Sequence, residues 1–132
     1  MTELLEDRTV LIIEDDLILT LSLELMLKKI GFTRFVRAET GEKAISLAKK
    51  TCPDLMLVDI CLGPGISGVE AVKEIQESCQ APVIYITGNS DEKNRTVAGE
   101  TDYVDYLVKP ITPVEVRRSV EKIWPETIGS KG

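Results

Sequence analysis

Two groups of carboxylates stand at the ends of apolar runs in this 132-residue sequence. The run 10–13 leads directly into Glu14, Asp15 and Asp16, and a second run ends at Asp59. Carboxylates about 5 Å apart repel each other by roughly 3 kcal/mol per pair at an effective dielectric constant of about 20. A divalent cation removes that repulsion, and Mg²⁺ prefers one or two carboxylates together with water and phosphate oxygens. The two acidic groups therefore predict a magnesium site, provided that the fold brings them together.

Alternating patterns of apolar residues predict the elements that position these groups. Short apolar runs indicate strands at 9–14, 33–38, 55–59, 82–86 and 104–108. The segments between them have the apolar spacing of helices, although 90–102 predicts only a short or poorly packed helix. Five strands that alternate with five helices predict an α/β fold, in which a five-stranded parallel sheet carries helices on both faces.

Polar residues mark where several of these helices begin. Asp16 precedes an apolar helix and is predicted to be its N-cap. Ser67 with Glu70, and Thr112 with Glu115, have the spacing of capping boxes at the starts of the third and last helices. These boundaries place the acidic residues in the turns between strands and helices.

The carboxyl ends of parallel strands meet at one edge of a sheet, where ligands bind in open α/β folds. The first strand ends at Glu14 and Asp15, and the third ends at Asp59. The fourth ends at Thr87 and the fifth at Lys109. We therefore expect this edge to gather acids, a hydroxyl and an amine.

Composition excludes several classes of function. The chain has no histidine, which rules out Ser-His-Asp chemistry and the usual catalytic zinc sites. Its net charge is −6, and the only dense basic pair is Arg117 and Arg118, so direct binding to nucleic acid is not expected. The first residues have neither the basic start nor the apolar run of a signal peptide, and no membrane association is expected.

The three cysteines, Cys52, Cys61 and Cys79, are predicted to be core or loop thiols. Their number is odd and their spacing matches no zinc module, whereas a secreted domain of this size would more often pair its cysteines. We therefore expect the protein to work in a reducing cytoplasm.

Four motifs occur in order along the chain: Val-Leu-Ile-Ile-Glu14-Asp15-Asp16, Pro-Asp-Leu-Met-Leu-Val-Asp59, Ile-Thr87-Gly and Tyr106-Leu-Val-Lys109-Pro110. Together they resemble the CheY-like receiver domain of bacterial two-component response regulators. The resemblance covers residues 8–124 and leaves 1–7 and 125–132 as tails. It implies a flavodoxin-like, doubly wound sheet with strand order 2-1-3-4-5, and a single-domain response regulator that acts as a switch and not as an enzyme.

The resemblance also implies a role for each site residue. Asp59 would accept a phosphoryl group from a histidine kinase or a histidine phosphotransfer protein. Asp15 and Asp59 would bind Mg²⁺ directly, with Mn²⁺ able to substitute, while Glu14 would act through water and Cys61 through its backbone carbonyl. Lys109 would pair with the phosphoryl oxygens.

Two further residues would form the switch that the resemblance implies. Thr87 would turn its hydroxyl onto the phosphoryl group, and Tyr106 would follow by changing rotamer, so that a downstream protein target reads the altered face. The loop 60–68 is one residue longer than the commonest form of the family.

Three other functions remain open from the residues alone. An interaction module with a vestigial acidic site would show no magnesium dependence. A phosphohydrolase of the haloacid dehalogenase type would want a second acid two residues after its nucleophile, where this chain has Cys61. A flavodoxin-like cofactor carrier would want a phosphate-binding loop rich in Ser, Thr and Gly after the first strand, and this chain has acids there.

In the first helix, one apolar face is assigned to the core: Leu19, Leu23, Met26, Leu27 and Ile30. A second apolar stripe, Ile18, Leu21 and Leu25, lies opposite that face. Scattered surface leucines are common and need no function. A contiguous stripe beside the acidic residues would nevertheless suit docking of a kinase or a phosphotransfer helix bundle.

Overall fold

The computed structural model describes residues 4–88 and 92–125. Its elements in chain order are η1 (Leu5–Asp7), β1 (Thr9–Ile13), α1 (Leu17–Ile30), β2 (Arg34–Ala38), α2 (Gly41–Thr51), β3 (Leu55–Asp59), α3 (Gly68–Gln76), β4 (Val83–Thr87), α4 (Glu92–Ala98), β5 (Asp105–Val108) and α5 (Pro113–Ile123). The strands form one parallel sheet in the order β2-β1-β3-β4-β5. This confirms the predicted fold class and strand order.

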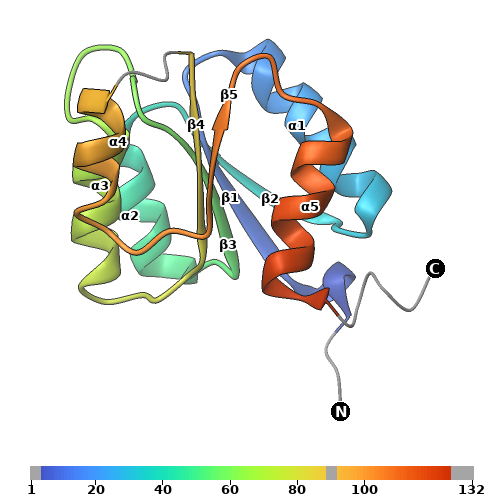
Figure 1. Ribbon diagram of the computed structural model, residues 1–132. Helices are drawn as coiled ribbons and strands as arrows, with labels where there is room; N and C mark the ends of the chain where they lie inside the picture. Colours follow the sequence, from blue (N-terminus) through green and yellow to red (C-terminus); the bar gives the residue numbers. More distant parts are fainter. Residues whose placement is uncertain (1–3, 89–91, 126–132) are drawn as a thin grey trace.

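The molecule has three layers, with the sheet in the middle (Figure 1). Helices α1 and α5 cover one face, and α2, α3 and α4 cover the other. Alternate residues of the strands face opposite layers. Val10 and Ile12 pack with the α1 and α5 side, whereas Leu11 and Ile13 pack with the α2 and α3 side.

Local polar chemistry sets the helix ends as predicted. The Asp16 carboxylate accepts hydrogen bonds from the backbone N–H groups of Ile18 and Leu19. Both predicted capping boxes are present, at the starts of α3 and α5. The helix α4 is short, and Ala98 is its one buried residue, in agreement with its sparse apolar pattern.

Helix α1 binds the sheet through both apolar and charged contacts. Its residues Leu23, Leu27 and Ile30 are buried, as the sequence spacing predicts. Glu24 is also buried, and its carboxylate accepts two hydrogen bonds from the Arg37 guanidinium of β2, at 2.6 and 2.9 Å. A buried carboxylate needs such a partner. In the described part of the chain, no helix is both long and apolar enough to cross a membrane.

The packed structure begins before residue 8. Leu5 lies in η1 and its side chain is buried in the core on the α1 and α5 side. The sequence analysis had placed this residue in an N-terminal tail. Leu4 and Leu5 stand alone among polar residues, so no repeating apolar pattern indicates that Leu5 is buried.

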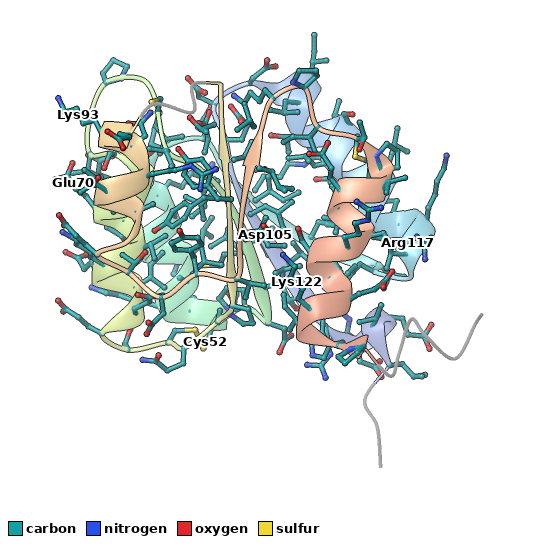
Figure 2. The ribbon with its side chains drawn as sticks, in the orientation of Figure 1. Cys52, Glu70, Lys93, Asp105, Arg117 and Lys122 are labelled. Carbon is teal, nitrogen blue, oxygen red and sulfur yellow. A yellow bond between two sulfur atoms is a disulfide. The ribbon has the colours of Figure 1, made fainter. Side chains whose placement is uncertain are left out.

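The prediction that all the cysteines are thiols is wrong for two of them. Cys52 and Cys79 form a disulfide that joins the end of α2 to the segment between α3 and β4, at the lower edge in Figure 2. The fold brings these distant positions to a Cα–Cα separation of 5.6 Å, within the usual disulfide range. Cys61 keeps a free, exposed thiol. The argument for a reducing compartment from unpaired cysteines therefore does not hold.

Gly68 offers a test of the packing between β3 and α3. Its N–H donates to the Ile60 carbonyl, and a Cβ atom at this position would lie 2.1 Å from the Asp59 carbonyl oxygen. We predict that Gly68→Ala lowers the free energy of unfolding by about 2–3 kcal/mol, because backbone must move to admit the methyl group. Urea unfolding would measure it. Gly88→Ala is the control, since the nearest atom of the described residues, Lys109 Cδ, would lie 3.9 Å from its Cβ; equal stabilities of the two variants would contradict the prediction.

Candidate functional site

The strand ends bring the predicted site residues to one edge of the sheet. Glu14 follows β1, and its side chain is buried with 5% exposed; Asp59 ends β3 with 3% exposed. Asp15 is exposed beside them. One carboxylate oxygen from each of the three residues lies within 4.8 Å of the others. The like charges are therefore as close as the sequence analysis expected.

Lys109, which follows β5, supplies the positive charge at this edge. Its Nζ lies 3.2 Å from Asp59 Oδ2 and 3.5 Å from Glu14 Oε1. Burial acts to lower the pKa of Lys109, but the nearby charges of Asp59 and Glu14 and the hydrogen bonds to them outweigh it and raise the pKa. Lys109 therefore stays protonated beside Asp59.

The fold makes the Glu14 carboxyl hard to ionise. Burial, together with the charge of Asp59, raises the pKa of Glu14 to about 8, although the Asp16 N–H donates to Glu14 Oε2 at 3.1 Å and favours the charged form. Glu14 Oε1 is buried and has no hydrogen-bond partner within the described ranges, although it pairs with the Lys109 ammonium group at 3.5 Å. This buried oxygen, whose contact with the ammonium group is long, is suited to a closer cation.

The residues at this edge fit Mg²⁺. All three side chains offer oxygen donors, the ligand type that this ion prefers. The burial of Glu14 and the close approach of three carboxylates both disfavour the metal-free state. Asp15 is exposed, so solvent and dissolved ligands can reach the three carboxylates from its side.

The backbone after β3 orients the Asp59 carboxylate. The N–H of Cys61 donates to Asp59 Oδ1 at 3.0 Å, while Oδ2 faces Lys109. The Cys61 side chain points to the exposed surface, where its sulfur lies 3.9 Å from the amide nitrogen of Asn94 on α4. Both oxygens of Asp59 are thus held in place before any ligand binds.

Thr87 and Tyr106 lie on the adjacent strands β4 and β5. Thr87 is fully buried, and its carbonyl accepts the Lys109 N–H at 2.8 Å. Tyr106 is buried too, with the Arg95 guanidinium of α4 4.5 Å from its ring centre and the Tyr103 ring 6.4 Å away. The sequence analysis missed Arg95, because a cation on a weakly amphipathic helix gives no local sign of the ring it covers.

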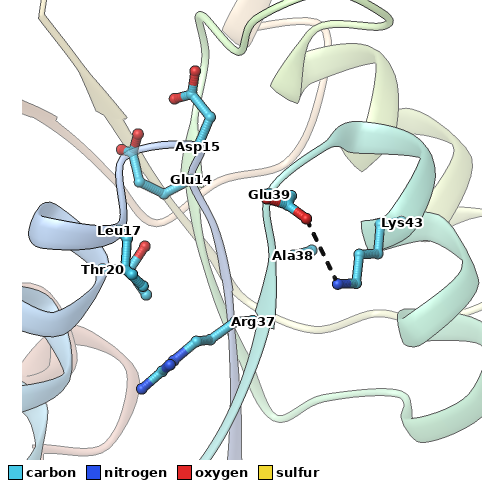
Figure 3. Close-up of a pocket in the computed structure, with 8 residues that line it drawn as sticks. All are labelled: Glu14, Asp15, Leu17, Thr20, Arg37, Ala38, Glu39 and Lys43. Carbon is cyan, nitrogen blue, oxygen red and sulfur yellow. Dashed lines mark ion pairs between the residues drawn. The ribbon is translucent and has the colours of Figure 1, made fainter.

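A cavity of about 230 Å³ opens beside the acids (Figure 3). Glu14, Asp15, Leu17 and Thr20 line one side, and Arg37, Ala38, Glu39 and Lys43 line the other. Lys43 and Glu39 form an ion pair at 3.9 Å on its rim. The sequence analysis did not predict this cavity, since it forms between β2 and the turn after β1, which are distant in the chain.

Comparisons with known proteins agree with the geometry. A family model described as the response regulator receiver domain matches residues 10–121. The transcriptional regulatory protein YvrH of Bacillus subtilis (strain 168) is 28% identical over 127 residues, which are 96% of this chain and 53% of YvrH. The chain spans about half the length of the curated relatives that it matches.

Solved structures are also similar. The signal receiver domain of a modulated diguanylate cyclase from Desulfovibrio desulfuricans G20 is 30% identical, with a TM-score of 0.81 over 94% of this chain and 100% of that one. The receiver domain of the sensor histidine kinase PA1611 from Pseudomonas aeruginosa PAO1 is 27% identical, with a TM-score of 0.76 over 87% of this chain and 95% of that one. The PA1611 structure has a magnesium ion coordinated in its active-site cleft.

The raised pKa of Glu14 predicts how the stability of the metal-free protein depends on pH. Between about pH 4.5 and pH 8, the unfolded chain releases the Glu14 proton and the folded chain retains it, so stability falls as pH rises. We expect wild type to lose about 1–2 kcal/mol more than Glu14→Gln between pH 5 and pH 8, a value reduced for solvent screening.

Urea unfolding in EDTA at the two pH values would measure this difference. Adding Mg²⁺ at pH 8 should then stabilise wild type more than Glu14→Gln, because the ion binds only the folded protein and favours the ionised carboxylate. The same pH dependence in both proteins would show that Glu14 ionises normally in the fold.

Proposed function

This chain belongs to the response regulator receiver domain family, and on that premise we propose that it accepts a phosphoryl group on Asp59 and then changes conformation to control a partner protein. One observation carries the proposal. Asp59 is buried among carboxylates suited to a divalent cation, with the Lys109 ammonium group 3.2 Å from its Oδ2. This is the arrangement that a carboxylate nucleophile for phosphoryl transfer needs.

In the proposed reaction, an Asp59 oxygen attacks the phosphorus of a phosphohistidine on a histidine kinase or phosphotransfer protein. The O–P bond forms and the P–N bond breaks; the imidazole nitrogen keeps the electron pair and takes up a proton. Lys109 would pair with the phosphoryl oxygens, and the Cys61 N–H holds the carboxylate in position. The chain supplies positioning and charge, which account for most of the catalysis in this chemistry.

We propose that Asp15, Asp59 and the Cys61 carbonyl hold Mg²⁺, with Glu14 acting through water. The ion would neutralise charge on the transferred phosphoryl group. The PA1611 receiver domain, which holds magnesium in its active-site cleft, supports this assignment.

The proposed switch connects Asp59 to the face formed by α4 and β5. Thr87 would turn its hydroxyl to the phosphoryl group, and Tyr106 would move to another rotamer. Strand register supports the pairing, because Thr87 lies opposite Val108, two residues beyond Tyr106 on β5. Tyr106 would then leave its contact with Arg95, so a local change of charge would alter an exposed helix.

The output of this switch is a further proposal. The curated relatives include transcriptional regulatory proteins about twice as long as this chain. We infer an effect on a protein target in the cytoplasm, through the α4 and β5 face.

A docking site for the phosphodonor is proposed on α1. Leu17, Ile18, Leu21 and Leu25 all have exposed side chains, and Ile18 is 81% exposed. The helix starts directly after the acidic residues, and the exposed Val114 at the start of α5 lies on the same side of the sheet. A helix of the donor could pack its apolar face here and bring its phosphohistidine to Asp59.

The phosphoacceptor is tested by intact mass after incubation with acetyl phosphate and Mg²⁺. Wild type should gain one phosphoryl group, whereas Asp59→Asn and wild type in EDTA should gain none. Asp102→Asn is the matched control, since this exposed acid lies outside the site and the variant should label normally. No labelling of wild type would favour a phosphorylation-independent interaction module, and repeated turnover of an added phosphate ester would favour a phosphohydrolase.

The docking site is tested with a phosphorylated histidine phosphotransfer protein that transfers to wild type. The double variant Ile18→Glu, Leu21→Glu should accept phosphoryl groups at about one tenth of the wild-type rate or below, because carboxylates disfavour an apolar interface. Its labelling by acetyl phosphate should stay unchanged. Leu4→Glu changes an exposed leucine at the opposite edge and should transfer normally; normal transfer to the double variant would exclude α1 as the docking site.

A further inference from the structure

The long loop after β3, residues 61–67, lies against the start of α2. The Glu42 carboxylate, in the first turn of α2, accepts the Ile66 N–H at 3.2 Å. Gly65 has a φ of 108° and lies so close to Glu42 that a Cβ atom would be 2.8 Å from a carboxylate oxygen. A glycine is needed for both the backbone conformation and the close approach.

The Ile66 side chain makes a second contact with α2. It packs over Gly41, where a Cβ atom would lie 2.6 Å from Ile66 Cγ1. The loop is thus attached to α2 by one hydrogen bond and two close approaches, which involve Gly41, Glu42, Gly65 and Ile66. None of these contacts could be read from the sequence, because the residues are far apart in the chain, with 24 positions between Glu42 and Ile66.

The two ends of the same loop are fixed to Asp59 and its neighbour. At the start, the Cys61 N–H donates to Asp59 Oδ1. At the end, the Gly68 N–H donates to the Ile60 carbonyl, and Gly68 packs on the Asp59 carbonyl oxygen without room for a side chain. With both ends held at β3, the contact with α2 determines where the middle of the loop lies.

We propose that Glu42 is a positioning residue for the cation site: by holding Ile66 it fixes the loop that carries the Cys61 carbonyl and so sets the affinity for Mg²⁺. This inference rests on the proposed function, in which that carbonyl is a ligand. Residues that support a metal ligand from outside commonly change affinity by about 10–100-fold when they are replaced.

Glu42 also has an ordinary structural role that the test must separate. An acid in the first turn of a helix interacts favourably with the helix dipole. Glu42→Gln removes the charge but keeps an oxygen that can accept the Ile66 N–H, whereas Glu42→Ala removes both. The interaction with the helix dipole is therefore lost in both variants, whereas the hydrogen bond to the loop is lost only in Glu42→Ala.

The experiment measures Mg²⁺ affinity by calorimetry without any phosphodonor, and amide exchange of Ile66 by NMR. We expect Glu42→Ala to bind Mg²⁺ about tenfold more weakly, the lower end of the range for supporting groups, and to exchange the Ile66 amide faster. Glu42→Gln should bind within about twofold of wild type, since its amide oxygen replaces the acceptor. Glu39→Ala is the control, because this exposed acid is near the site and pairs with Lys43.

A second variant guards against an unfolded Glu42→Ala protein. Gly65→Ala should weaken Mg²⁺ binding as well, since its methyl group would displace the Glu42 carboxylate. Wild-type affinity in Glu42→Ala, or a loss in Glu42→Gln as large as in Glu42→Ala, would overturn the inference. If wild type itself bound no Mg²⁺, the proposed function would fail with it, so the two failures are distinguishable.

Discussion

Repulsion among Glu14, Asp15 and Asp59 is the constraint on which the carboxyl edge of the sheet depends. Their oxygens lie within 4.8 Å of one another, and two of the three side chains are buried where water cannot screen them. The molecule meets this cost in part with Lys109, whose ammonium group lies near both Asp59 and Glu14. It meets it in part by holding the Glu14 proton up to about pH 8. The folded protein is therefore less stable when this site is empty. It becomes more stable when a cation, or a phosphoryl group together with its cation, is bound.

The sheet withstands the repulsion at this edge because the rest of the fold is well packed. Central strands β1, β3 and β4 are buried on both faces, so their ends cannot move apart without exposing the core. The Glu24–Arg37 pair ties α1 to β2, and the contacts of Glu42 and Ile66 tie the loop after β3 to α2. Rigid elements thus position groups that would otherwise separate.

Local physics explains which features could be predicted from the sequence. The strands, the caps at Asp16, Ser67 and Thr112, and the shortness of α4 depend on neighbouring residues, so their patterns are visible in the chain. The gathering of Glu14, Asp59 and Lys109 follows from strand order. The Cys52–Cys79 bond, the burial of Leu5, and the contacts of Arg95 and Glu42 were not predicted, because each joins segments whose proximity depends on three-dimensional packing.

The contact between Arg95 and Tyr106 bears on how much of the protein is phosphorylated. Ala98 is the one buried residue of α4, and the Arg95 guanidinium of this helix lies over the Tyr106 ring of β5. In the proposed mechanism, the arrangement of α4 and the phosphorylation of Asp59 are thermodynamically coupled. Thermodynamic reciprocity then requires that a target which prefers the rearranged α4 also favours the phosphorylated form by the same factor. The amount of target present would thereby influence how much of the protein is phosphorylated, and information would pass from output to input.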